Sequence, residues 1–231
     1  MIQELPKTLF EAQSGPKKYL TPRSRRLQET LRLTERLPGP SVGRYNVSVS
    51  HSHRLVWFRV AKVGSTTIRH ALLDAGVTLD LEQHFGINVP WLLTPGYLRA
   101  AFVRHPTERF VSGWRQKVLR WNYLQLSDEL YEQSQDLAGF LDWFEQQDIT
   151  TCDPHFRLQS SLIPRHKIHF LGRMETFNED VDRMFELIGS KRVEDHHRNK
   201  ANPNPPEISD ANKRRIDRLY ERDFKRFGYT P

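Results

Sequence analysis

The stretch LVWFRVAKVGSTTIRHALLDAG, residues 55–76, decides the fold. Its first six residues, Leu55–Val60, form a nearly continuous apolar run, which is typical of a strand buried on both faces. Apolar residues then recur at helical spacing, and Gly76 follows where a helix would stop. These helical apolar residues are Ile68, Ala71, Leu72 and Ala75. The stretch therefore predicts a buried strand, a loop and a helix in succession.

A second stretch of the same kind follows. Leu98–Val103 is another apolar run, and it ends at Arg104, His105 and Pro106, where the proline can occupy the first turn of a helix. The apolar face of that helix is marked by Phe110, Val111, Trp114 and Val118. Because strands alternate with helices, we expect an α/β fold, with a parallel sheet flanked by helices.

The remaining chain is predicted to be mostly helical in its C-terminal half, with few further strands. Ser209 or Asp210 can cap the last helix. The other elements expected from the spacing are an extended segment at Thr78–Phe85, helices at Leu137–Phe144 and Met174–Ile188, and a third strand at His166–Phe170. Prolines punctuate the first 50 residues, so residues 1–50 are expected to form an N-terminal arm with a basic helix over Arg23–Leu37. Residues 51–231 are expected to form one domain.

Composition restricts the class of protein. The 231 residues include 35 basic and 28 acidic side chains, a net charge of +7 that favours anionic partners. The longest uncharged stretch, residues 83–98, is too short to span a membrane and contains Pro90 and Pro95. The single cysteine, Cys152, excludes an intrachain disulfide framework and favours a reducing, cytoplasmic compartment.

The loop after the first strand is a candidate anion site. Lys62-Val63-Gly64-Ser65-Thr66-Thr67 joins the strand to the start of a helix, where free backbone N–H groups and the helix dipole attract negative charge. Lys62 adds a mobile positive charge, and the hydroxyls add donors. An ordinary turn capped by serine or threonine remains the alternative. The Walker A order G-x-x-x-x-G-K-[ST] is absent.

The loop after the second strand is a second candidate. Arg104 follows the strand's carboxyl end, where open α/β sheets place ligands. Ser112 comes about two turns into the next helix, so both side chains could contact one phosphate. A salt-bridging arginine and a packing serine are the alternative.

Taken together, the two segments resemble the paired nucleotide-binding motifs of sulfotransferases that use 3′-phosphoadenosine 5′-phosphosulfate (PAPS), especially the carbohydrate sulfotransferase branch (sulfotransferase family 2-like). The first resembles a P-K-x-[AG]-[ST]-[ST]-[ST] segment, with Ala61 in place of proline, and the second, residues 104–112, resembles R-H-P-x-x-R-[FL]-x-S. Three further segments resemble that branch: 153–159 resembles D-x-H-[WF]-x-P-Q, 170–176 resembles F-[IL]-G-x-x-E-[TN], and 220–229 resembles Y-x-x-D-F-x-x-F-G-Y.

The resemblance implies a P-loop-like fold and a sulfotransferase domain over residues 51–231. It implies that the first loop binds the 5′-phosphosulfate and that Arg104 and Ser112 bind the 3′-phosphate. The nucleotide product would be 3′-phosphoadenosine 5′-phosphate (PAP), and no metal would be required. The 5′ contacts fall on Lys62, Val63, Gly64, Ser65, Thr66 and Thr67. Lys62 would also stabilise the leaving phosphate oxygen. Arg198 and Lys200, in a basic loop near the C-terminus, would close over the 3′-phosphate.

An acceptor hydroxyl or amine also needs a general base. We expect His84, on the segment after the first helix, to be that base; Glu82 is the fallback, and His155 competes as a base or acceptor-contacting residue. The acceptor is expected to be a carbohydrate or another small hydroxylated molecule. The close histidine pairs lack a third ligand at a familiar spacing, so no metal site is expected. Oligomeric state is left open.

Two other classes of function compete with this prediction. One is an ATP-Mg²⁺-dependent small-molecule kinase, against which the missing Walker A order and the basic strand end argue. The other is a basic module that binds nucleic acid or another polyanion, although no familiar nucleic-acid-binding signature is present. Golgi relatives of the carbohydrate branch carry a membrane anchor, and we expect none in this protein. We therefore expect a soluble, bacterial, cytoplasmic enzyme, with a Golgi-lumen domain lacking its anchor as the alternative.

Overall fold

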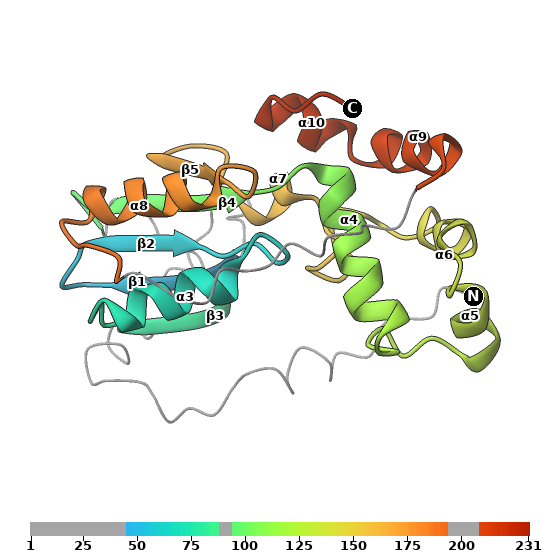
Figure 1. Cartoon of the computed structure of the whole chain (residues 1–231), viewed down its shortest axis with the longest axis horizontal. Helices are drawn as coiled ribbons and strands as arrows, with labels where there is room; N and C mark the ends of the chain where they lie inside the picture. Colours follow the sequence, from blue (N-terminus) through green and yellow to red (C-terminus); the bar gives the residue numbers. More distant parts are fainter. Residues whose placement is uncertain (1–44, 88–93, 194–207) are drawn as a thin grey trace, which may run out of the picture.

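The computed structural model describes residues 45–87, 94–193 and 208–231, except for the side chains of 83–87. A five-stranded sheet forms one part of this region and a group of helices forms the other (Figure 1). The strands are β1 (Tyr45–Ser50), β2 (Leu55–Phe58), β3 (Leu81–Ile87), β4 (Leu98–Val103) and β5 (Phe170–Arg173), in the spatial order β3-β1-β2-β4-β5.

The core of the sheet is parallel, as the α/β prediction requires. β2 pairs with β4, and β4 pairs with β5, in parallel register. The sheet as a whole is mixed, because β1 runs antiparallel to both β2 and β3. Only four residues separate β1 from β2, and so short a connection can form a hairpin but not a parallel crossover. Tyr45–Ser50 was expected in the arm and instead lies within the sheet.

Two long helices lie along the sheet, α3 (Ser65–Asp74) and α8 (Phe177–Leu187). The connection from β4 to β5 contains most of the helical part. It comprises α4 (Pro106–Trp114), the π-helix η3 (Arg115–Leu119), α5 (Asp128–Gln133), α6 (Leu137–Phe144) and α7 (Gln159–Leu162). After β5 and α8, the chain returns to this part with α9 (Asp210–Leu219) and α10 (Glu221–Phe227).

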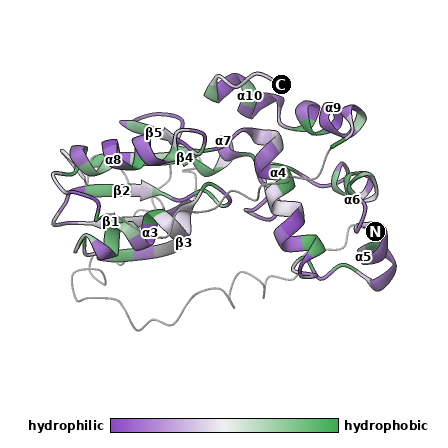
Figure 2. Cartoon of the chain, in the orientation of Figure 1, coloured by the Kyte–Doolittle hydropathy of each residue, from purple (hydrophilic) through white to green (hydrophobic). Residues whose placement is uncertain are grey.

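Each part has its own hydrophobic core. The first lies between the sheet and its helices, and it includes Trp57, Phe102 and Phe185. The second is built around Phe110 of α4. The Phe110 ring packs against the rings of Phe140 on α6, Tyr220 between α9 and α10, and Phe156 before α7. Figure 2 shows hydrophobic colouring on β2, whereas α8 and α9 alternate between hydrophobic and hydrophilic residues, as helices with one buried face do.

Several predicted elements are confirmed with shifted ends. Pro106 does occupy the first turn of α4, and the Ser209 hydroxyl accepts a hydrogen bond from the Asn212 N–H at the start of α9. The third strand starts at Phe170, where the prediction had it end. The expected arm helix at Arg23–Leu37 lies outside the described residues.

Candidate active site

The two predicted anion loops meet at one edge of the sheet. β2 and β4 are parallel neighbours, so the loop beginning at Arg59 and the loop beginning at Arg104 leave the sheet side by side. In Figure 1 the arrow of β2 points towards the side of the molecule on which α4 lies. The site therefore lies between the sheet and the helical part, at the carboxyl ends of the parallel strands, which is where such sheets bind ligands.

Gly64 is required by conformation and by packing. It is the residue before α3, with a left-handed φ of 75° that glycine adopts without strain. A Cβ atom there would also lie 2.5 Å from Cε2 of Phe177 on α8. The glycine thus lets the start of α3 contact the start of α8, and the first-turn N–H groups of α3 have no partner within the helix.

Lys62 also has a left-handed backbone, with φ 72°. This conformation costs free energy for a residue with a side chain, and such costs recur at functional sites. The Lys62 Nζ donates a 2.5 Å hydrogen bond to Oε1 of Gln116 on η3. Burial, with the positive charges of Lys117, Arg104 and Arg109, lowers the pKa of the Lys62 ammonium to about 8. Four cationic side chains therefore share one small region.

The other residues of the first loop line the start of α3. Val63 is buried, so it offers a ligand only its backbone. Ser65 and Thr67 are half-buried and Thr66 is exposed. All three hydroxyls belong to the first turn of α3, next to its backbone N–H groups.

Arg104 lies at the carboxyl end of β4, as predicted. Its guanidinium forms an ion pair with Glu108, with Nη2 3.2 Å from Oε2. Ser112 is half-buried on α4, two turns along the helix. This exposed ion pair is weak, so an anionic ligand can compete for Arg104.

The backbone of Arg104 is held by Gln159. The Gln159 side chain accepts from the Arg104 N–H at 3.0 Å and donates to the Arg104 carbonyl at 2.9 Å. Gln159 begins α7, where the buried carboxylate of Asp223 on α10 accepts hydrogen bonds from the N–H groups of Gln159 (2.7 Å) and Ser160 (2.9 Å). A carboxylate at a helix start is favourable, and here it connects α10 to the Arg104 loop.

The C-terminal segment supports the same loop. Glu175 accepts a hydrogen bond from the His105 N–H at 2.6 Å and another from the Tyr229 hydroxyl at 2.9 Å. His105 Nε2 lies 3.0 Å from the Thr230 carbonyl oxygen. His105 thus stabilises the strand-to-helix turn.

Arg109 was not among the predicted site residues. Its side chain is fully buried and donates hydrogen bonds to three backbone carbonyls, those of Ala61 (2.9 Å), Arg157 (2.8 Å) and Pro154 (2.8 Å). It therefore joins the Lys62 loop to the segment before α7. Its signal in the sequence was its place as the second arginine of the segment 104–112, which resembles R-H-P-x-x-R-[FL]-x-S.

His155 belongs to a cluster of polar and aromatic side chains from the segment before α7, from η3 and from the chain after η3. Its Nδ1 lies 2.7 Å from Oδ1 of Asp153. The ring of Tyr123 meets the His155 ring edge-on at 5.3 Å between centroids, and Lys117 Nζ lies 3.9 Å from the centroid of Tyr123. Lys117 and Gln116 were missed as well, because no sequence motif distinguishes them.

The predicted base segment is described only in part. Glu82 on β3 forms an ion pair with Arg69 of α3, so the negative charge of its carboxylate already has a cationic partner. The backbone of His84 lies on β3 opposite Val47, but its side chain lies outside the described residues. Arg198 and Lys200 lie outside them as well. Within the described ranges, no group of three or more His, Cys, Asp or Glu side chains could hold a metal ion.

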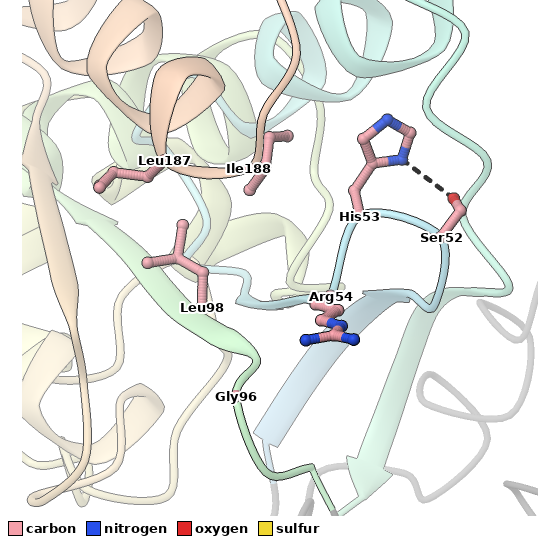
Figure 3. Close-up of a pocket in the computed structure, with 7 residues that line it drawn as sticks. All are labelled: Ser52, His53, Arg54, Gly96, Leu98, Leu187 and Ile188. Carbon is pink, nitrogen blue, oxygen red and sulfur yellow. Dashed lines mark hydrogen bonds between the residues drawn. The ribbon is translucent and has the colours of Figure 1, made fainter.

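A shallow pocket of about 230 Å³ lies at the opposite end of the strands. Figure 3 shows it between the β1–β2 turn, the start of β4 and the end of α8. It is lined by Ser52, His53, Arg54, Gly96, Leu98, Leu187 and Ile188. None of the predicted site residues contributes to it.

A comparison with protein families decides what this arrangement belongs to. The sequence profile described as "Sulfotransferase family" matches residues 45–230, which include the whole sheet and both loops. The chain belongs to the sulfotransferase family. Comparisons with curated proteins and with solved structures gave no match. Membership makes the protein an enzyme of sulfuryl transfer and implies PAPS as the donor. In the part of this sulfotransferase that the structure describes, no helix could cross a membrane.

Proposed function

We propose that this sulfotransferase moves a sulfuryl group from PAPS to a hydroxyl or amine of a carbohydrate or another small hydroxylated acceptor. The observation that carries the proposal is the meeting of the Lys62 and Arg104 loops, where burial and three neighbouring cations lower the pKa of Lys62. Positive charges held close together in a partly buried site favour a ligand with several negative charges.

The described residues fit that ligand. The 5′ side of PAPS would lie against the first turn of α3, where Ser65, Thr66 and Thr67 add hydroxyl donors to the backbone N–H groups of the helix start. Arg104 and Ser112 would bind the 3′-phosphate. We further propose that Arg198 and Lys200 close over that phosphate.

Bound PAPS supplies an activated sulfuryl group, and the chain's own residues position and neutralise it. Lys62 is held at the mouth of the first loop by Gln116, where its charge can stabilise an oxygen that becomes negative. Arg109 fixes the distance between this loop and the segment of His155. Most of the rate enhancement would come from positioning and from charge stabilisation, as in phosphoryl transfer.

Binding of PAP can be tested without knowing the acceptor. A ligand that binds only the native state stabilises it. When the ligand concentration is about 100 times the Kd, the free energy of unfolding rises by about 2.7 kcal/mol, which raises the Tm by about 5–11 °C in a protein of this size. We expect this shift with PAP, little shift with AMP or ATP-Mg²⁺, and loss of most of the PAP shift in Arg104→Ala. Arg54→Ala, which changes an arginine at the opposite end of the strands, is the control and should keep the shift. A shift with ATP-Mg²⁺ alone would contradict the proposal.

The carbohydrate acceptor is supported by Trp121. This side chain is 60% exposed on the segment after η3, two residues before Tyr123. The guanidinium carbon of Arg120 lies 5.6 Å from its ring centroid. An exposed indole face suits the apolar face of a sugar ring.

Replacing Trp121 tests the acceptor class. In a screen of soluble polysaccharides and aryl glycosides, Trp121→Ala should raise the acceptor KM about three- to tenfold and leave the PAP Kd unchanged. Trp121→Phe should recover part of the loss because it restores a flat ring. An unchanged KM for every carbohydrate acceptor would show that Trp121 does not contact the sugar.

A further inference from the structure

His155 and Asp153 form an oriented pair. The Asp153 carboxylate accepts a hydrogen bond from the His155 backbone N–H at 2.8 Å and lies 2.7 Å from Nδ1 of its ring. A carboxylate can only accept, so Nδ1 carries the proton and Nε2 carries the lone pair. The same arrangement fixes the tautomer of catalytic histidines that act as bases.

Arg109 places this pair beside the Lys62 loop. One guanidinium binds the carbonyl of Ala61, which precedes Lys62, and the carbonyl of Pro154, which precedes His155. Both carbonyls therefore lie within hydrogen-bonding reach of a single planar group. Gly113 of α4 adds a second restraint, because a Cβ atom there would lie 2.9 Å from Cε1 of Phe156.

The π-helix η3 connects the two sides of the site. Its consecutive residues Gln116 and Lys117 contact Lys62 and Tyr123 respectively, and the Tyr123 ring contacts His155. π-helical turns are rare and recur at functional sites. Lys62 and His155 are thus joined by one short series of contacts.

Burial favours the neutral form of His155. Burial is the main cause that lowers its pKa below the ordinary value of 6.5; Lys117 and Arg109 lower it further, while Asp153 opposes them. The imidazole is therefore neutral at pH 7 and can accept a proton. His84, the other candidate base, lies on the edge strand β3. In the sheet order β1 separates β3 from β2, so the backbone of His84 is not on a strand next to β2, from which the Lys62 loop leaves.

We propose that His155, positioned by Asp153, is the general base that takes the proton from the acceptor. As the acceptor oxygen bonds to sulfur, Nε2 of His155 takes the hydroxyl proton, and the bond between sulfur and the phosphate oxygen breaks. The electron pair of that bond stays on the phosphate oxygen beside Lys62, and the imidazolium later releases its proton to water. This inference rests on the proposed sulfuryl transfer.

The test compares three matched variants, His155→Gln, His84→Gln and His53→Gln. The assay measures PAP formed from PAPS with the acceptor mixture described above, and with water alone as a second acceptor. We expect His155→Gln to lower kcat about 10²–10⁴-fold with an unchanged PAP Kd. His53, at the opposite end of the strands, is the control and should retain wild-type kcat. A loss of less than tenfold in His155→Gln overturns the proposal, and so does an equal loss of PAP affinity, because either indicates a structural role.

Two further readouts separate a base from a merely structural histidine. Added imidazole should restore part of the activity of His155→Ala, and failure of this rescue in a folded variant would overturn the proposal. Asp153→Asn should move the acidic limb of the pH–kcat profile while PAP binding persists; an unmoved limb would remove the positioning role of Asp153.

If the wild type neither binds PAP nor forms it, the proposed function fails. If it does both and His155→Gln matches it, only this inference fails.

Discussion

Lys62→Met is expected to lower kcat about 10²–10³-fold, the usual effect of removing one group that stabilises developing negative charge. Methionine keeps much of the side-chain volume and removes the charge. The apo Tm of this variant at pH 7 should equal or exceed that of the wild type, because the change removes a partly buried charge that other cations repel. A folded Lys62→Met variant with wild-type kcat would exclude the proposed role of Lys62.

The pH dependence of PAP binding provides an independent test. The ammonium of Lys62 in the free enzyme loses its proton near pH 8 because its pKa is lowered from 10.5. A bound anion favours the charged form, so the PAP Kd should rise above about pH 8 by up to about tenfold per pH unit. In Lys62→Arg the charge persists, and the Kd should stay flat between pH 7 and 10. A flat profile in the wild type would mean that Lys62 does not contact the nucleotide.

Arg109→Met is expected to destabilise the protein and to abolish turnover together. Three buried carbonyls lose their donor, at about 1–3 kcal/mol for each group left without a partner. A net loss of about 3 kcal/mol would lower the Tm by about 6–12 °C. Thermal unfolding measures the loss of stability, and PAP formation below the new Tm measures the loss of activity.

Arg215→Met is the matched control for Arg109→Met. Arg215 also makes several hydrogen bonds, but mainly to the Asp142 and Glu145 side chains on the surface, with one long bond of 3.5 Å to the Ala138 carbonyl. Exposed ion pairs contribute about 0–1 kcal/mol, so its Tm should fall by no more than a few degrees and its activity should persist. Equal effects of the two substitutions would contradict the structural role assigned to Arg109.

The local parts of the fold could be predicted from the sequence. The apolar run that became β2, the helical spacing of α3 and the proline at the start of α4 each depend on neighbouring residues, whose effects are visible in a short window. The antiparallel β1 was missed because Tyr45–Ser50 carries only two apolar aliphatic side chains, and its partners lie on both sides in the sheet.

The site was predictable where motifs mark it and not where distant segments meet. Lys62 and Arg104 do lie at the ends of adjacent strands, as their positions after apolar runs indicated. Arg109 is the second arginine of the 104–112 motif, but its structural role was missed because its partners are 45 to 48 residues away. Glu82 was predicted as the fallback base, and its ion pair with Arg69 could not be predicted because it depends on how α3 packs on β3. The structure places several of the predicted site residues, and the roles of all of them stay predictions.

The hydrogen bonds of Asp223 have a consequence for biosynthesis. The Arg104 loop is held by Gln159, and Gln159 is held by a carboxylate that lies in α10. Chains grow from the N-terminus and domains fold as units during synthesis, so the sheet strands emerge from the ribosome well before this carboxylate does. A ribosome-bound nascent chain that ends before α10 would contain both the Lys62 loop and the Arg104 loop. We expect such a chain not to be retained on immobilised PAP.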